Sequence, residues 1–140
     1  MLLKNATILV IDDDADVLTA IRLFLKPKAK DVVTEKNPNH IQSLISQKSF
    51  DLVILDMNFN GLINTGNEGI FWLRKIKELN KDIEVILITA YGDIDLAIRA
   101  LKEGASDFLI KPWKNEKLLQ SVEDILSKKA SGKEKIWKPV

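Results

Sequence analysis

Residues 8–14 read Ile8-Leu9-Val10-Ile11-Asp12-Asp13-Asp14, an apolar run that ends in three carboxylates. Residues 52–56 have the same form, with Leu52-Val53-Ile54-Leu55 followed by Asp56. Short, nearly continuous apolar runs that include β-branched residues are typical of parallel strands buried on both faces. Because open α/β sheets build their sites at the carboxyl ends of their strands, we expect these carboxylates to gather at one edge.

Strand and helix patterns alternate five times along the chain. The predicted strands are Thr7–Ile11, Asp31–Glu35, Asp51–Leu55, Glu84–Thr89 and Phe108–Ile110. A helix with apolar residues at three- and four-residue spacing follows each strand, and the last is predicted at about Asn115–Lys128. This alternation predicts an α/β domain with a parallel sheet and helices on both of its faces.

The composition limits the classes of protein that the chain can belong to. Its 140 residues suffice for one domain with a buried core. There is no cysteine, which excludes disulfides and thiolate sites and fits a reducing compartment. No apolar stretch reaches the roughly 18 residues of a membrane span, and the N-terminal apolar run is too short for a signal peptide. We therefore expect a cytoplasmic protein that does not bind membranes.

Charge is spread unevenly between the body of the chain and its end. Residues 128–140 hold five lysines and one glutamate, a net charge of +4, so that residues 1–127 carry −3. A body without surplus positive charge argues against direct nucleic-acid binding by residues 1–127. We interpret residues 1–127 as the domain and residues 128–140 as a lysine-rich linker or tail, with contact to phosphates as the alternative role.

Three of the carboxylates at the strand ends are candidates for a metal site. Asp12 and Asp13 follow the first predicted strand and Asp56 closes the third, and converging anions repel one another unless a cation lies between them. Hard oxygen ligands favour Mg²⁺, or Mn²⁺, over zinc. The alternative role is helix capping, which we assign to Asp14.

Two further polar side chains end neighbouring strands. Thr89 ends the fourth predicted strand, and Lys111 follows the fifth, directly before Pro112. A hydroxyl with the N–H groups beyond it suits an oxyanion, and an ammonium suits a carboxylate or a phosphoryl oxygen. Alone, a threonine at a strand end is more often structural, and a lysine before a proline is usually a surface residue. Together with a metal and Asp56 they suit the transfer of a phosphoryl group to the Asp56 carboxylate.

Four stretches in order resemble the receiver domain of two-component response regulators. They are residues 8–14, 51–56, 88–91 and 104–112, and the resemblance covers about 5–127. The part from Thr89-Ala90-Tyr91-Gly92 through Trp113 most resembles the receivers of sigma-54-dependent (NtrC-like) transcription activators. The resemblance implies a flavodoxin-like, doubly wound sheet of five parallel strands in the order 2-1-3-4-5, with five helices.

The resemblance also implies which residues hold the metal and the phosphoryl group. Asp56 is the phosphoacceptor. The implied Mg²⁺ ligands are Asp13, Asp56, Asp12 largely through water, and the backbone carbonyl of Asn58. The implied phosphoryl-binding groups are the side chains of Thr89 and Lys111 and the backbone N–H groups of Met57 and Ala90. Lys111-Pro112 is expected to be a cis bond.

The function implied is a signalling switch that is phosphorylated by a sensor histidine kinase. Thr89 moves toward the phosphoryl group and Phe108, the aromatic switch, turns inward. The face of the fourth helix, fifth strand and fifth helix then forms a homodimer or changes its contacts with an output domain, to regulate transcription. Such a chain catalyses its own phosphorylation from phosphohistidine and its slow dephosphorylation, and is not a turnover enzyme in the usual sense.

The chain departs from this family in the loop after Asp56. The family commonly has a proline four residues on and a glycine eight residues on. Here Asn60 takes the place of the proline, and the matching glycine is Gly69, so the loop is about five residues longer. The polar loop at Asn58–Asn67 either affects access, kinase contact or phosphoryl lifetime, or is a tolerated surface insertion.

Other functions fit parts of the sequence. A small aspartyl-phosphate phosphatase typically has a second aspartate two residues after its nucleophile, where this chain has Asn58. A flavin-binding module needs phosphate-binding loops after the first strand, where three aspartates repel a phosphate. A degenerate receiver used for docking alone would lack some of the chemical residues, which are all present. A stand-alone receiver that regulates a protein partner is the alternative to one that precedes an output domain.

Overall fold

The computed structural model describes residues 2–57, 67–90 and 94–134. The expected carbonyl ligand Asn58 and most of the lengthened loop lie outside the described residues. Within the described ranges no helix is both long and apolar enough to cross a membrane.

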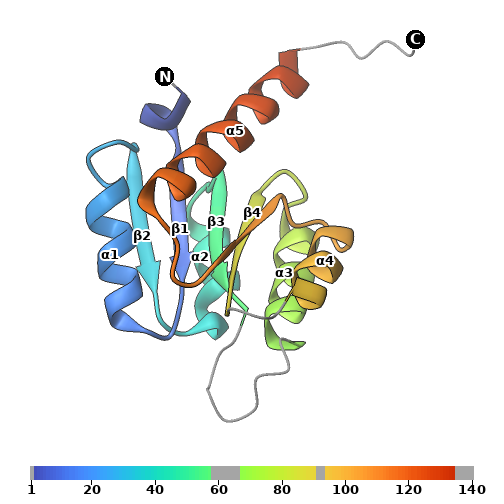
Figure 1. The fold of residues 1–140 in the computed structure, drawn as a ribbon. Coiled ribbons are helices and arrows are strands. Elements are labelled where there is room, and N and C mark those ends of the chain that lie inside the picture. The colour runs from blue at the N-terminus through green and yellow to red at the C-terminus, as the bar shows by residue number, and fades with distance from the viewer. Residues whose placement is uncertain (1, 58–66, 91–93, 135–140) are drawn as a thin grey trace.

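A five-stranded parallel sheet with the order β2-β1-β3-β4-β5 forms the centre of the molecule (Figure 1). The strands are β1 (Thr7–Ile11), β2 (Asp31–Glu35), β3 (Leu52–Asp56), β4 (Glu84–Thr89) and β5 (Asp107–Ile110). The helices are α1 (Ala15–Leu25), α2 (Ile41–Gln47), α3 (Asn67–Leu79), α4 (Ile94–Lys102) and α5 (Asn115–Glu134). Two short 3-10 turns, η1 (Leu2–Asn5) and η2 (Pro38–His40), precede β1 and α2. The predicted α/β class and strand order are confirmed.

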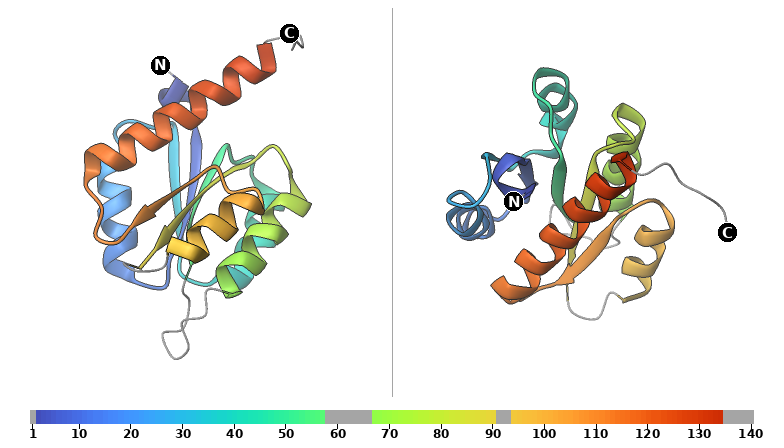
Figure 2. Two further views of the ribbon diagram at one scale, coloured as in Figure 1. Left: turned by 45° about the vertical axis from the view of Figure 1, so that its right-hand side comes forward. Right: turned by 90° about the horizontal axis from the view of Figure 1, so that it is seen from above.

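The sheet separates two apolar clusters because successive side chains of a strand point to opposite faces. On one face, Ile8 and Val10 of β1 pack in the cluster that includes α1 and α5. On the other face, Leu9 and Ile11 pack in the cluster that includes α2, α3 and α4. The views of Figure 2 show this division of the helices between the two sides of the sheet. Strands covered on both sides explain the continuous apolar runs of the sequence.

The ends of two helices follow from single residues. Asp14 has an extended backbone and its carboxylate accepts the Asp16 N–H at 2.9 Å, so it caps the start of α1 as predicted. Gly104, just beyond α4, has a φ of 112°, a left-handed conformation that glycine adopts without steric cost. The chain can therefore turn directly from α4 into β5.

Helix α5 is longer than the sequence predicted. It was expected to end at about Lys128, yet the helix continues to Glu134. The ammonium of Lys129 donates to the backbone carbonyls of Asp51 and Asp82, at 3.4 and 2.5 Å, in the segments that lead into β3 and β4. This contact between distant parts of the chain lies beyond the expected helix end, and spacing within the sequence does not reveal it.

Candidate functional site

The register of the strands brings the candidate residues to one edge of the sheet. Ile11 of β1 lies beside Leu55 of β3, so that the residues that follow them, Asp12 and Asp56, come to the same level. Asp56 in turn lies beside Ile88, the residue before Thr89. Thr89 lies beside Ile110, the residue before Lys111. Four strand ends thus carry an acid cluster, a hydroxyl and an ammonium to the carboxyl edge.

Three carboxylates meet at this edge. Asp12, Asp13 and Asp56 each offer one oxygen, and these oxygens lie within 4.8 Å of one another. Asp12 and Asp56 are buried, with Asp56 only 2% exposed, whereas Asp13 is exposed. An open side on a cluster of hard oxygen donors is the arrangement that Mg²⁺ requires, because this ion usually keeps several of its waters.

Backbone contacts fix the most buried of these carboxylates. The N–H of Asp12 donates to the Glu35 carbonyl of β2 at 3.2 Å. The N–H of Asp14 donates to Asp12 Oδ1 at 2.9 Å. Sequence reasoning assigned Asp14 a capping role and missed this second one. The signal was the Asp-x-Asp spacing, since an aspartate side chain commonly accepts from the backbone two residues further on.

Lys111 contacts two of the three carboxylates. Its Nζ lies 3.2 Å from Asp12 Oδ2 and 3.3 Å from Asp56 Oδ1. Its backbone N–H donates to the Thr89 carbonyl at 2.8 Å, and the Lys111-Pro112 bond is cis, as expected. The half-buried ammonium therefore sits across the space between two buried anions, and it is held there by its own strand end.

The electrostatics of this site are set by burial and by the lysine. Burial raises the pKa of Asp12 above its ordinary value, although the Asp14 N–H and the Lys111 ammonium act in the opposite direction. Burial alone would lower the pKa of Lys111, but attraction to Asp56 and Asp12 outweighs it, so that this pKa is raised. Lys111 therefore stays protonated, while at Asp12 the effect of burial outweighs that of the nearby ammonium.

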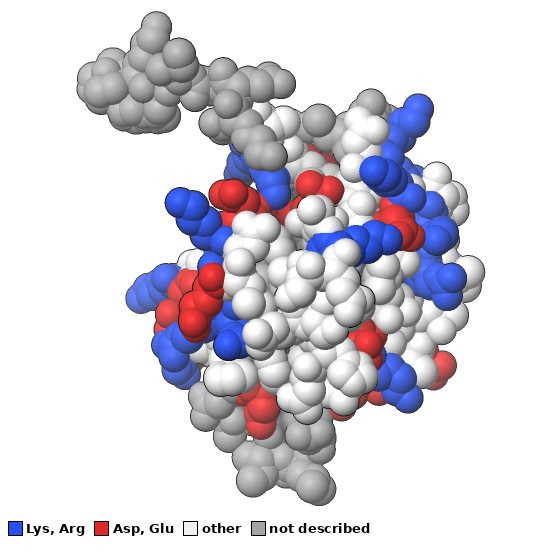
Figure 3. All heavy atoms as spheres, turned by 180° about the vertical axis from the view of Figure 1, so that it is seen from behind, with Lys and Arg blue, Asp and Glu red and all other residues white. Residues whose placement is uncertain are grey.

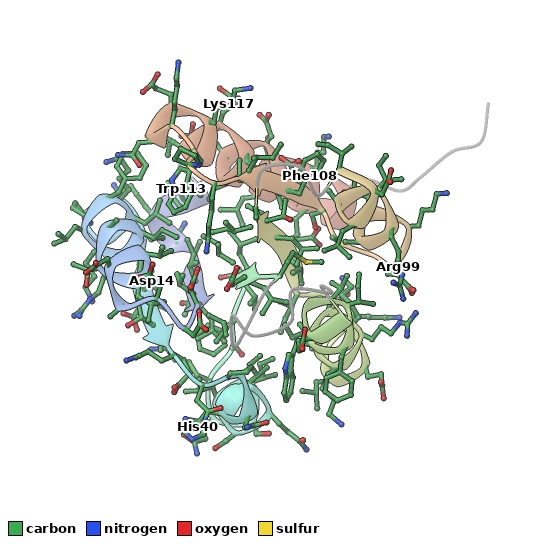
Figure 4. All side chains as sticks on the ribbon, turned by 60° about the horizontal axis from the view of Figure 1, so that its bottom comes forward. Asp14, His40, Arg99, Phe108, Trp113 and Lys117 are labelled. Carbon is green, nitrogen blue, oxygen red and sulfur yellow. The ribbon has the colours of Figure 1, made fainter. Side chains whose placement is uncertain are left out.

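Thr89 and Phe108 lie on the same face of neighbouring strands. Thr89 is 1% exposed, and among the described residues its Oγ1 has no hydrogen-bond partner. A buried hydroxyl in that state is costly, which suits a group that gains its partner when a ligand binds. Phe108 is half-buried against the cluster on the side of α2, α3 and α4, and Figure 4 shows it between α4 and α5.

The two backbone N–H groups expected to bind the phosphoryl group, at Met57 and Ala90, have different environments. The N–H of Met57 donates to the Ile88 carbonyl at 2.9 Å, so it serves the sheet in this structure. Ala90 directly follows β4 and is exposed.

Gly69 lies in the first turn of α3, against the residue that follows Asp56. A Cβ atom at Gly69 would lie 2.7 Å from the Met57 Cα and 2.8 Å from its carbonyl oxygen. Only glycine permits this approach, so the lengthened loop still brings a glycine against the end of β3.

Comparison with known proteins identifies the family of this chain. A model described as the response regulator receiver domain matches residues 8–123. The chain therefore belongs to the receiver domains of response regulators from two-component systems.

Named relatives agree with this assignment. The transcriptional regulatory protein ZraR of Klebsiella oxytoca is 35% identical over 124 residues, which is 89% of this chain and 27% of that protein. The C4-dicarboxylate transport transcriptional regulatory protein DctD of Pseudomonas aeruginosa is 34% identical over 119 residues, or 85% of this chain and 25% of that protein. The chain thus spans about a quarter of these relatives' length. They confirm the resemblance to sigma-54-dependent activators.

Solved structures show the same fold. The N-terminal signal receiver domain of a two-component response regulator from Bacteroides fragilis is 44% identical, with a TM-score of 0.78, over 87% of this chain and 97% of that one. The receiver domain of NtrX from Brucella abortus is 28% identical, with a TM-score of 0.77, over 86% of this chain and 98% of that one.

Proposed function

We propose that this receiver domain is a phosphorylation-dependent switch in which Asp56 accepts a phosphoryl group from a histidine of a sensor kinase. The observation that carries the proposal is the position of Lys111, whose ammonium lies 3.3 Å from Asp56 and 3.2 Å from Asp12. A fixed cation beside a buried carboxylate is what a site needs when that carboxylate becomes a more highly charged acyl phosphate.

The residues divide the chemistry among them. An oxygen of the ionised Asp56 attacks phosphorus, the bond from phosphorus to the kinase imidazole breaks, and the bonding electrons leave with the imidazole nitrogen. No general base is required, because the nucleophile carries no proton. Lys111 pairs with a phosphoryl oxygen in place of the Asp56 carboxylate, and the Thr89 hydroxyl donates to another.

The acid cluster fits a divalent cation. The ligands that we assign are Asp12, Asp13 and Asp56, with the Asn58 carbonyl as the fourth group. The raised pKa of Asp12 supports this assignment, since burial outweighs the effect of the Lys111 ammonium on this carboxyl. When bound, Mg²⁺ or Mn²⁺ would neutralise charge on the transferring phosphoryl oxygens.

The output surface that we assign is formed by α4, β5 and α5. Within α4, only Ala97 and Ala100 are fully buried. The larger side chains of Ile94, Ile98 and Leu101 are between 39% and 45% exposed. Exposed aliphatic side chains on one helix suit a surface that is covered in another state. We propose that Thr89 and Phe108 reshape this surface after phosphorylation, so that it dimerises or changes its contacts with an output domain that regulates transcription.

We do not assign direct nucleic-acid binding to this domain. Figure 3 shows acidic and basic side chains interspersed around the margin of the face seen from behind, with uncharged side chains at its centre. A phosphate-binding surface would gather basic side chains instead.

Substitution of the phosphoacceptor tests the function. Acetyl phosphate with Mg²⁺ should add the mass of one phosphoryl group to the wild-type protein and to Asp16→Asn, which removes an exposed carboxylate of α1. Asp56→Asn should remain unlabelled, because an amide is not a nucleophile here. Intact-protein mass spectrometry measures the result, and full labelling of Asp56→Asn would assign the phosphoryl group to another residue.

A further inference from the structure

A single carboxylate joins the strand that carries Phe108 to helix α5. Asp107 Oδ1 accepts the backbone N–H of Phe108 at 2.8 Å. Asp107 Oδ2 accepts the hydroxyl of Ser121, on the second turn of α5, at 2.6 Å. Any shift of the Phe108 backbone therefore acts on the same side chain that holds α5.

The alternation of the strand explains why this link crosses the sheet. Phe108 packs with the cluster on the α2, α3 and α4 side, and the next residue, Leu109, packs with the α1 and α5 side. Asp107, the residue before Phe108, points to the same side as Leu109 and so reaches α5. A displacement of Phe108 on the α4 side can therefore reach α5 through the peptide unit between Asp107 and Phe108.

The hydrogen bond is strong for its position. Ser121 is only 6% exposed, and its helix neighbours Leu118 and Val122 belong to the apolar core. A buried hydroxyl needs a partner, and a hydrogen bond to a carboxylate is shorter and stronger than one between neutral groups. The apolar contacts of α5 with Leu109 are non-directional and permit sliding, whereas this hydrogen bond specifies one position of the helix.

We propose that the Ser121–Asp107 hydrogen bond transmits the phosphorylation response from Phe108 to α5, the last of the described helices. Asp107 and Ser121 are positioning residues, since neither touches the acid cluster. The far part of α5 is held separately by Lys129 at the Asp51 and Asp82 carbonyls. A change at Ser121 therefore shifts the first turns of α5 relative to Lys129, whose contacts stay in place. This inference rests on the proposed function.

Ser121→Ala tests the link, with Asp124→Asn as the matched control. Asp124 is exposed on the same helix and accepts a hydrogen bond from Gln120, so its loss leaves the link intact. Each protein is treated with acetyl phosphate and Mg²⁺, the extent of labelling is read by intact mass, and backbone amide exchange of residues 115–122 is measured with and without the phosphodonor. Ser121→Thr, which retains the hydroxyl, serves as the rescue variant.

We expect phosphorylation to change the exchange rate in this segment by about twofold or more in the wild type and in Asp124→Asn. Ser121→Ala should be labelled to the same extent but should lose most of that change, and Ser121→Thr should recover it. An undiminished response in Ser121→Ala, reduced labelling of that variant, or a labelled wild type without any change would overturn the inference. If Ser121→Ala does not fold, by circular dichroism, Asp107→Ala, which removes the acceptor of the same hydrogen bond, takes its place under the same criteria. An unlabelled wild type would instead refute the proposed function.

Discussion

Asp12 and Asp13 are neighbours in the chain with opposite environments. Asp12 is fully buried and held by two backbone contacts, whereas Asp13 is exposed. The raised pKa of Asp12 means that the folded protein binds its proton more tightly than the unfolded chain does. That contribution to stability is present below the ordinary value of 3.8 and is lost as pH rises through the folded value, so ionised Asp12 costs stability at neutral pH.

Asp12→Asn should therefore stabilise the protein in the absence of divalent cations. We expect the free energy of unfolding to rise by on the order of 1 kcal/mol, because a buried charge is removed while Lys111 keeps Asp56 as a partner. Asp13→Asn, at the exposed neighbour, should change stability little. Both substitutions should weaken Mg²⁺ binding. Urea denaturation at pH 7 with a chelator measures stability and calorimetric titration measures binding; a destabilised Asp12→Asn would show that Lys111 depends on that carboxylate.

Asp31 connects strand β2 with the C-terminal ends of helices α1 and α2 through ion pairs. It begins β2, lies 3.3 Å from Lys26 at the end of α1, and also pairs with Lys48 at the end of α2. Hydrogen bonding to Lys48 is the main cause that lowers the pKa of Asp31, and Lys26 adds to it. A carboxylate with a lowered pKa stabilises the fold above its ordinary value of 3.8, and this stability is lost as pH falls through the lower folded value.

A double-mutant cycle of Asp31→Asn and Lys48→Met should measure this tie. We expect a coupling energy of about 0.2–1 kcal/mol at pH 7, the range of partly exposed ion pairs. The coupling should start to fall as pH drops below 3.8, where the unfolded chain binds the proton first, and should be lost as pH falls through the lower folded value, where Asp31 of the folded protein becomes protonated. Stability is measured by urea denaturation of the four proteins at each pH. A coupling that persists unchanged at low pH would indicate a packing contact rather than an ion pair.

At the scale of the whole molecule, the exposed aliphatic side chains are not all equivalent. Ile98 of α4 is 45% exposed within the proposed output surface. Leu23 is 72% exposed on α1, which lies beyond β1 and β2 at the other end of the sheet (Figure 1). The two residues therefore distinguish a dimer through α4, β5 and α5 from association through any apolar side chain.

Phosphorylation should promote dimerisation, and Ile98→Glu should oppose it. We expect Ile98→Glu to weaken the phosphorylated dimer by about tenfold or more, or ~1.4 kcal/mol, because a charge would be buried in the interface. Leu23→Glu should dimerise as the wild type does, and all three proteins should be labelled at Asp56. Sedimentation velocity with and without acetyl phosphate measures the association; equal loss in both variants would place the interface elsewhere.

Sequence reasoning succeeded where local pattern and burial coincide. The runs before Asp12 and Asp56 predicted buried parallel strands, and the strands form there because both faces of the sheet are covered. The expected end of the last helix, at about Lys128, was wrong, because α5 continues to Glu134 and Lys129 contacts distant backbone carbonyls. Sequence reasoning also missed the second role of Asp14, whose amide holds Asp12.

The sequence by itself determined the alternating architecture and the strand ends that carry acids, because strand and helix periodicities and the needs of buried apolar side chains are local properties. The family's motifs further singled out Asp56, Thr89, Phe108 and Lys111. Only the tertiary structure decided that Lys111 spans Asp12 and Asp56, and that Asp107 joins Phe108 to Ser121. These contacts depend on the register of neighbouring strands and on the position at which a helix packs against the sheet. Both involve residues far apart in the chain.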